Sequence, residues 1–528
     1  MPNFRLLGAV AVALLLYART LGFDFTYLDD DVLIRDDQVF LAQPSSVVRS
    51  FAHTYFHEAG RDHAYYRPIV NASYGVDANL GGPSPRIYHA TNVWLHALAV
   101  GLLFLLLRRF GYGENVALFG SLVFAVHPAL TETVAWIPGR NDSLLAVFAF
   151  SAWLLFLRGH EPGRWPSRIG HGLCFLCSLL CKETAMVLPL LWLGQAVFVD
   201  KRPWRTTLAP WVLAGWGAGL AVYVAARAAV LSGLGAQGLG ARSALSNLAL
   251  LPSSLGKLVL PIQLSVLAVP EDTRLWPGLV ALGLLVALFF LRQIRRAGLW
   301  FGLACFVAFL LPGLPASTLL ILENRLYLPA LGVVLIACEC ARATAWSGRR
   351  AWIAGGAALA VLAALAVHHG GNFSDRLTFC QAAVLGSPHS SLAHRNLGVA
   401  YHMKGDEHSA WNEYQAALAQ DAGEPVAHNN IAVILMAHGQ LPQAEQHLRQ
   451  ELAKNPRYIP AHRNLALVLR TMKRVDEAAA EWQRVLDLGS NDPEAMRELS
   501  AYYQDRDPGK TEQYGRMLKL REDASGRR

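Results

Sequence analysis

The C-terminal third of the chain repeats itself with a fixed step of 34 residues. The strings Ala393–Leu397, Ala427–Ile431 and Ala461–Leu465 begin 34 residues apart, and Ala410, Ala444 and Ala478 keep the same step. A unit of this length cannot bury its own apolar face and must stack on copies of itself. The sequence therefore predicts an α-helical solenoid in this part of the chain.

A helix–turn–helix unit with this period is the tetratricopeptide repeat (TPR). The predicted TPR domain covers residues 388–528. Within it we expect repeats near 391–424, 425–458 and 459–492, followed by a degenerate capping repeat over 493–522.

The chain as a whole is 53% hydrophobic and 16% charged. The apolar residues are concentrated in residues 1–370, where they form long runs. A membrane span needs roughly 20 apolar residues. Eleven segments are candidate spans: 5–22, 89–108, 115–131, 141–158, 169–182, 184–199, 208–231, 274–292, 298–313, 326–343 and 351–369. A twelfth segment, 246–268, contains Pro252, Lys257 and Pro261, so we predict a re-entrant or interfacial piece. The expected fold is all-α: a polytopic membrane domain over 1–370, a linker over 371–387 and the TPR domain.

The basic residues lie in short clusters between the apolar runs, at Arg108-Arg109, 158–168, 201–205, 292–296 and 342–350. With the N-terminus in the cytoplasm, each cluster falls in a cytoplasmic loop, as the positive-inside rule requires. This pattern disfavours a nucleic-acid partner. It predicts a multi-pass protein of the cell (inner) membrane, with its TPR domain on the outer, periplasmic face.

The first outer loop, predicted over 23–88, opens with three consecutive acids, Asp29, Asp30 and Asp31. Asp29 and Asp30 are candidate catalytic residues, because a carboxylate can take the proton of an attacking hydroxyl. Asp31 is a candidate supporting residue. A solvated acidic turn or a helix N-cap is the alternative. The run permits a divalent metal, Mg²⁺ or Mn²⁺, on Asp29 and Asp30, although nothing in the spacing requires one.

Further ionisable residues lie on the predicted outer side, at the ends of apolar segments, where an unpaired charge is costly. The cations are candidates for binding a lipid-linked phosphate: Arg67, Arg140, Lys182 and Arg325. Five other residues are candidate supports for the site: His89, His127, Glu132, Glu183 and Glu323. Alternatively, each cation pairs with a nearby carboxylate, and His127 caps a helix end.

The order of these motifs resembles a known family. The series is Asp29-Asp30, Tyr66-Arg67-Pro68, Tyr88-His89 with Asn92, His127-Pro128 with Thr131-Glu132, Gly139-Arg140, Cys181-Lys182-Glu183 and Glu323–Pro329, followed by TPRs. It resembles the transmembrane and TPR-containing O-mannosyltransferases, which are C-type (GT-C) glycosyltransferases. The short repeat array and the Ala/Leu/Arg-rich composition suggest a bacterial relative.

The resemblance implies an inverting transfer of a hexose, mannose in the family, from a polyprenyl (dolichyl) phosphate carrier to Ser or Thr of an exported protein. The lipid-linked sugar would be the co-substrate, and the acidic pair of the family falls on Asp29-Asp30. Two other functions stay open: transfer to a glycolipid or polysaccharide acceptor, and a non-enzymatic membrane scaffold.

Asn396, Asn430 and Asn464 share one register on the first helix of each repeat. That helix lines the concave groove of a TPR array. A carboxamide offers a donor and an acceptor, which suits the backbone of an extended acceptor peptide. The alternative is a local role within each repeat.

Overall fold

The computed structural model describes residues 4–26, 28–56, 65–232, 247–315, 322–344 and 348–525. In these ranges the chain is helical and contains no strand, which confirms the all-α prediction. Contacts between Cα atoms divide the chain into two compact units, Met1–Ser387 and Pro388–Arg528.

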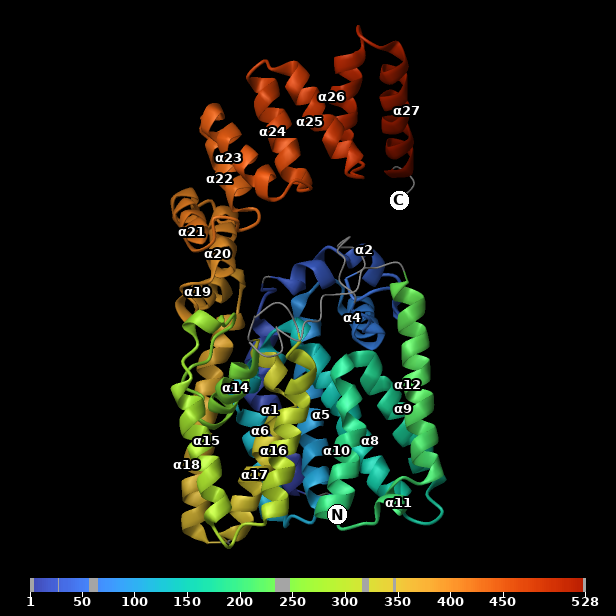
Figure 1. The fold of residues 1–528 in the computed structure, drawn as a ribbon, viewed down its shortest axis with the longest axis vertical. Helices are drawn as coiled ribbons and strands as arrows, with labels where there is room; N and C mark the ends of the chain where they lie inside the picture. The colour runs from blue at the N-terminus through green and yellow to red at the C-terminus, as the bar shows by residue number, and fades with distance from the viewer. Residues whose placement is uncertain are drawn as a thin grey trace. The chain divides into compact units, whose positions relative to one another are not determined.

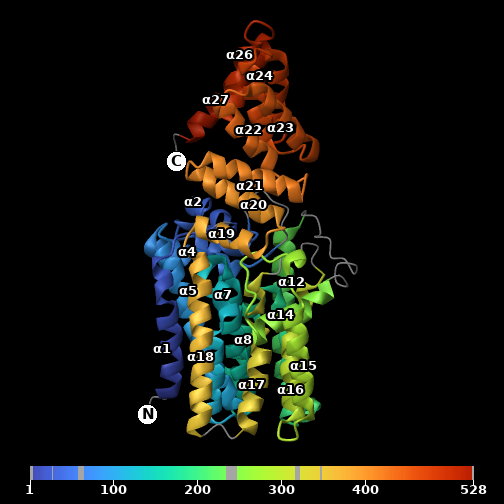
Figure 2. The same cartoon turned by 90° about the vertical axis from the view of Figure 1, so that its left-hand side faces the viewer.

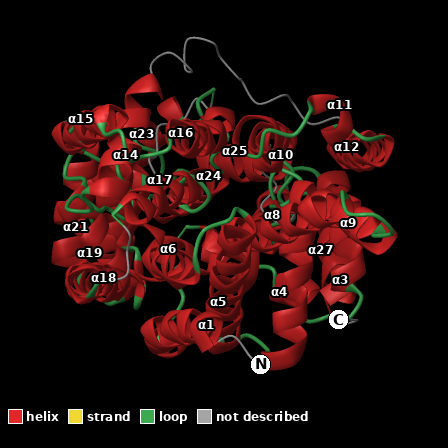
Figure 3. Ribbon diagram, turned by 90° about the horizontal axis from the view of Figure 1, so that it is seen from below, coloured by secondary structure: helices red, strands yellow, loops and turns green. Residues whose placement is uncertain are grey.

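The first unit is a bundle of long helices that run side by side (Figures 1 and 3). The helices are α1 (Phe4–Tyr17), α5 (Pro85–Arg109), α6 (Glu114–Val126), α8 (Arg140–Gly159), α9 (Trp165–Cys181), α10 (Leu188–Gly194), α12 (Pro210–Leu231), α15 (Trp276–Phe290), α16 (Arg296–Leu310), α17 (Ala330–Ala343) and α18 (Arg349–Gly370). Each of the eleven predicted spans therefore contains a helix.

Six helical segments in the described ranges are long and apolar enough to cross a membrane. They are Phe4–Gly22, Pro85–Arg109, Ile137–Gly159, Pro210–Leu231, Arg296–Gly313 and Arg349–Phe373. A bent pair, Glu114–Val126 with Pro128–Ala135, is a seventh candidate. The eleven-span topology stays a prediction. The predicted re-entrant segment contains α14 (Leu250–Val259), whose ten residues are too few for the roughly 20 that a span needs.

The bundle has a basic end and an acidic end. Arg5 pairs with Glu114, and Arg109 with Glu161 at 3.1 Å, so the N-terminus lies near two of the basic clusters. At that end the buried Glu339 carboxylate also accepts from Tyr112 at 2.7 Å and from two arginines of other clusters, Arg295 and Arg342.

The short elements of the first loop lie at the opposite end of the bundle: η2 (Asp31–Arg35), α2 (Gln38–Leu41), α3 (Ser46–Arg49) and α4 (Pro68–Gly81). Figure 1 shows α2 and α4 far from the N-terminus and from α11 (Trp204–Thr207). The basic clusters and the candidate site residues are therefore separated by the length of the bundle.

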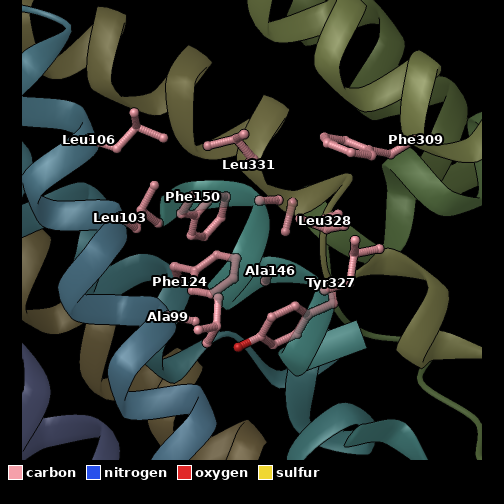
Figure 4. Close-up of a cluster of buried hydrophobic side chains, with 14 of the residues drawn as sticks. Ala99, Leu103, Leu106, Phe124, Ala146, Phe150, Phe309, Tyr327, Leu328 and Leu331 are labelled. Carbon is pink, nitrogen blue, oxygen red and sulfur yellow. The ribbon is translucent and has the colours of Figure 1, made fainter. Parts of the chain in front are cut away.

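A close-packed aromatic and aliphatic core holds the centre of the bundle. In Figure 4, Phe124 of α6, Phe150 of α8 and Tyr327 point toward one another. The ring centroids of Phe124 and Tyr327 are 4.9 Å apart, and the Tyr327 hydroxyl lies 2.7 Å from His96 Nδ1. A Cβ on Gly332 would come within 2.3 Å of a carbonyl of α16, so only glycine allows α16 and α17 to approach this closely. This core fixes the segment that carries Glu323 and Arg325.

The second unit consists of paired helices. They are α20 (Ser391–Met403), α21 (Glu407–Gln420), α22 (Ala427–Ala437), α23 (Leu441–Lys454), α24 (Ile459–Thr471), α25 (Val475–Asp487), α26 (Pro493–Tyr503) and α27 (Pro508–Ser525) (Figure 2). Ala393, Ala427 and Ala461 are fully buried at equivalent positions, which lets the first helices of neighbouring repeats pack closely. The predicted TPR solenoid is confirmed. The predicted linker, by contrast, contains a helix, α19 (Arg376–Gly386), that belongs to the first unit.

The separation of the two ends predicts the topology. A reporter enzyme fused after Arg205 should be active in the cytoplasm, and one fused after Arg528 on the outer side, because the basic clusters stay in the cytoplasm. Reporter activity in intact cells measures both. A cytoplasmic signal from the fusion after Arg528 would mean that residues 246–268 cross the membrane, and would split the candidate site residues between two compartments.

Candidate functional site

The three aspartates of the first loop have different surroundings. Asp30 is 1% exposed, and its Oδ2 accepts hydrogen bonds from the backbone N–H and the hydroxyl of Thr26, both at 2.6 Å. Burial is the main cause that raises the pKa of Asp30 to about 7, against the lowering effect of these two bonds. Asp29 is partly exposed and follows Leu28, whose φ of 70° is unusual for a side chain of this kind. Asp30 thus anchors the loop, and Asp29 is the more accessible carboxylate.

An aromatic and cationic cluster lies beside Asp29. The pKa of the buried Tyr55 hydroxyl is raised to about 12, mainly by burial. The nearby Arg67 opposes this rise, and the negative charge of Asp29 adds to it. The Arg67 guanidinium lies 5.2 Å from the centre of the Tyr55 ring and 4.7 Å from that of Tyr65. The charges of Asp29 and Arg67, which the sequence singled out separately, therefore act on the same tyrosine, Tyr55.

From Arg67, ionic contacts continue toward the last charged motif of the membrane unit. Arg67 binds Glu183 at 2.8 Å, and the neighbouring Lys182 binds both oxygens of Asp142 at 2.7 and 2.8 Å. Asp142 also accepts a hydrogen bond of 3.2 Å from the side chain of Asn324. These pairs connect the first loop, α8, α9 and the short helix η12 (Glu323–Leu326).

Two buried glutamates fix η12. Glu132 Oε2 accepts from the backbone N–H groups of Glu323 at 2.6 Å and Asn324 at 3.1 Å, so it caps this helix. The fully buried Glu323 carboxylate lies 2.6 Å from Lys257 Nζ and 3.0 Å from His369 Nε2. Glu323 thereby joins α14, η12 and the end of α18.

Arg140 is held entirely by protein groups. Its side chain is fully buried and forms an ion pair of 2.6 Å with Asp77. It also donates to Asn92 Oδ1 and to the carbonyl of Tyr88, both at 2.8 Å, and to Ser73 at 3.2 Å. In this structure Arg140 braces α4, α5 and α8, and it presents no free nitrogen to a phosphate.

Arg325 differs from the other three candidate phosphate ligands. It is half-buried, and its guanidinium makes no hydrogen bond or ion pair with the part of the chain that the structure describes. The turn that carries it is capped by Glu132 and tied to Asp142 through Asn324. Arg325 is thus a positioned cation whose donors are not used by any residue that the structure describes.

The two candidate histidines make bonds to backbone groups. His127 Nδ1 accepts from the N–H of Ala129 at 3.2 Å and caps the short helix Pro128–Leu130, while Nε2–H donates to the carbonyl of Leu258 at 2.9 Å. His89 Nε2 lies 3.5 Å from the carbonyl of Asp24, at the entry to the acidic loop. His127 thus takes the capping arrangement, and also fastens α14 to the bundle.

Two relevant groups have no signal in the sequence. Arg376 of α19 binds Asp31 at 2.5 Å across 345 residues, and Lys257 supplies the cation beside Glu323. Pairs this distant in sequence leave no local pattern. In the described ranges no three His, Cys, Asp or Glu side chains converge to hold a metal ion.

The three asparagines of the repeats are not equivalent. Asn396 is buried; its Oδ1 accepts from Arg395, and its Nδ2 makes no hydrogen bond with the described part of the chain. Asn464 donates to Asn429 of the preceding repeat at 2.9 Å, and Asn429 donates in turn to Asn430 at 3.3 Å. Asn430 and Asn464 are half-buried, so each combines a bond to Asn429 with access to the surface.

The fold and the site define a helical membrane protein with a braced cluster of charges at one end of its bundle and a TPR domain. Comparisons with known proteins agree with this class. Residues 87–226 match the family model of dolichyl-phosphate-mannose-protein mannosyltransferases. Protein O-mannosyl-transferase Tmtc1 of Drosophila melanogaster is 36% identical over 188 residues, which cover 35% of this chain and 22% of the fly protein. Human protein O-mannosyl-transferase TMTC2 is 34% identical over 201 residues, which cover 36% of this chain and 24% of the human one.

Over these residues the chain is similar to protein O-mannosyl-transferases. The aligned part spans less than a quarter of each of these two relatives. Among solved structures, PilF of Pseudomonas aeruginosa is 26% identical, with a TM-score of 0.25 over 27% of this chain and 65% of that one.

The different surroundings of Arg140 and Arg325 predict different effects of mutation. Arg140→Met should destabilise the fold by about 3–5 kcal/mol, because it leaves the buried Asp77 carboxylate without its partner. Arg325→Met should leave stability nearly unchanged and weaken binding of a polyprenyl phosphate. Thermal unfolding of the detergent-solubilised protein, with a lipid-binding assay, measures both. Equal destabilisation by the two changes would contradict this assignment.

Proposed function

We propose that the protein is an inverting glycosyltransferase. It moves a hexose, mannose by family resemblance, from a polyprenyl-phosphate carrier to a Ser or Thr hydroxyl of an exported protein. The observation that supports the proposal is the series of bonds from Arg67 to Glu183, and from the neighbouring Lys182 through Asp142 to Asn324, in the turn that holds Arg325. Asp29 lies in the same loop as Arg67, close enough for its charge to act on the Tyr55 hydroxyl beside that arginine. This supports a site in which a partly exposed carboxylate, Asp29, and a cation without a protein partner in the described ranges, Arg325, act together.

In the proposed reaction, Asp29 accepts the proton of the acceptor hydroxyl as its oxygen attacks the anomeric carbon. The bond between that carbon and the carrier phosphate breaks on the opposite face, and the phosphate leaves with the bonding electrons. An aspartate is too weak a base to deprotonate a hydroxyl beforehand, so proton transfer accompanies bond breaking. The result is a glycosidic bond of inverted configuration and a free polyprenyl phosphate.

The cations stabilise the charge that develops on the leaving phosphate, which is usually a large part of catalysis. Arg325 makes the direct contact, by the fork geometry that suits phosphate oxygens. Arg67 and Lys182 add positive charge from their pairs with Glu183 and Asp142. Arg140 and Glu132 act indirectly, by holding α8 and η12.

The TPR domain binds the acceptor polypeptide through the register of Asn396, Asn430 and Asn464, in which Asn430 and Asn464 reach the surface and the buried Asn396 lies behind it. A carboxamide matches the donor and acceptor pattern of a peptide backbone whatever its sequence. The bonds between Asn464 and Asn429 also support the alternative, in which the asparagines serve the array itself and the sugar acceptor is a glycolipid or polysaccharide.

Intact-mass analysis of exported proteins tests the reaction and the acceptor class together. Cells that lack the protein should lose hexose-sized mass increments on Ser/Thr peptides, and a plasmid copy should restore them. Loss of hexose from a lipid or polysaccharide, with protein masses unchanged, would support the alternative acceptor. No change in any glycan would favour the membrane scaffold.

The assignment of the base predicts a clear kinetic difference. Asp29→Asn should lower turnover by about 100-fold or more while the protein stays folded, since the carboxylate is partly exposed and a general base contributes on this scale. Asp36→Asn, a change at an exposed aspartate of the same loop, is the matched control and should keep wild-type turnover. The measurement is hexose transfer from a polyprenyl-phosphate donor in vesicles. Near-normal turnover of Asp29→Asn would exclude Asp29 as the base.

The acceptor role of the repeats predicts an effect on KM. Changing Asn396, Asn430 and Asn464 together to Ala should raise KM for a whole-protein acceptor by one to three orders of magnitude, at about 0.5–1.5 kcal/mol for each lost bond. Transfer to a short Ser/Thr peptide should change little. Asn412→Ala, at an exposed position of α21, is the control. An equal loss on long and short acceptors would contradict a role in acceptor binding.

A further inference from the structure

We propose that Arg376, in the first turn of α19, is a positioning residue that holds the acidic loop in its reactive shape. The inference rests on the proposed function, because it concerns the loop that carries Asp29. It adds a role for the predicted linker, which becomes part of the catalytic framework.

Three contacts join the start of α19 to the acidic loop. The Arg376 guanidinium binds Asp31 at 2.5 Å and donates through Nε to the carbonyl of Thr26 at 3.4 Å. One residue before the helix cap, the carbonyl of Ser374 accepts from the N–H of Asp24 at 2.9 Å. The segment is thus clamped on both sides of Asp29.

Thr26 links Arg376 to the aspartates. The Thr26 carbonyl accepts a hydrogen bond from Arg376, while the Thr26 N–H and hydroxyl donate to Asp30. Between Thr26 and Asp30 the backbone passes through Leu28, whose positive φ costs free energy and persists only where the surroundings enforce it. The contacts of Arg376 and Asp30 with Thr26 hold this backbone conformation, and they thereby fix the position of Asp29.

The support behind Arg376 is rigid. Asp375 caps α19 by accepting from the N–H of Thr378 at 3.0 Å and from its hydroxyl at 2.7 Å. The buried rings of Phe373 and Phe379 pack on each other with centroids 5.8 Å apart. Arginine suits the position, because its planar fork donates to a carboxylate and a carbonyl at once, whereas a lysine is a single point charge.

Asp31 has a second cationic partner that serves as a matched control. Arg35 lies 3.2 Å from the other oxygen of Asp31, one helical turn away, and its side chain is half-exposed. In the described ranges Arg35 bonds Asp31 alone and makes no hydrogen bond or ion pair with Thr26 or α19. Removing Arg35 therefore removes a charge from Asp31 without releasing the clamp.

The test compares Arg376→Gln, Arg376→Lys and Arg35→Gln in vesicles, using a polyprenyl-phosphate hexose donor and a short Ser/Thr peptide. A misplaced catalytic group should cost on the order of 10- to 100-fold in kcat, with KM for the donor within about threefold of wild type. Arg376→Lys should recover part of the loss, and Arg35→Gln should match wild type. Amide hydrogen exchange over residues 24–31 should be faster in Arg376→Gln and unchanged in Arg35→Gln.

Wild-type kcat and unchanged exchange in Arg376→Gln would overturn the inference. An equal loss of kcat in Arg35→Gln would overturn it too, because the effect would then come from the net charge near Asp31 and not from the clamp. If Arg376→Gln fails to fold, Arg376→Lys carries the same comparison. If the wild-type protein transfers no hexose, the proposed function fails, and the exchange measurement still decides whether Arg376 holds the loop.

Discussion

A charge that is buried at the end of a membrane bundle has to be paired, and this constraint organises the acidic end of the protein. An unpaired buried ion costs several kcal/mol, so each pair also fixes the elements that contribute its partners. Arg140 with Asp77, Lys182 with Asp142, and Glu323 with Lys257 join segments that lie far apart in the chain. Ion pairs therefore hold the segments at this end of the bundle in fixed positions, which loops alone would not do.

Two groups at this end are more accessible than the buried pairs. Asp29 is partly exposed, and the Arg325 guanidinium has no partner in the described ranges. Their neighbours are fixed, Asp29 through Thr26 and Asp30, and Arg325 through the capped turn of η12. Catalytic groups work best when they are held in place before the substrate arrives. In the proposed mechanism the paired charges give the rigidity, and Asp29 and Arg325 carry out the chemistry.

The sequence predicted the repeats and the apolar helices well, because both depend on local periodicity. It could not separate the roles of the charged residues. Arg140 and Arg325 look alike in the sequence, yet Arg140 is enclosed by Asp77, Asn92 and Tyr88, while Arg325 has no hydrogen-bond or ion-pair partner among the described residues. The adjacent Asp29 and Asp30 also differ in burial, because the burial of Asp30 depends on Thr26 and on the surrounding helices. Arg376 was missed because its partner Asp31 lies at the other end of the membrane unit in sequence.

The most direct test of this account locates the donor on the protein. A polyprenyl phosphate with a photoreactive group beside its phosphate is cross-linked to the protein in vesicles, and the labelled peptides are identified by mass spectrometry. The account predicts labelling of residues 322–328 and of the loop around Asp29, both lost in competition with unlabelled polyprenyl phosphate. Competable labelling confined to the basic end, around Arg109 and Arg295, would contradict it.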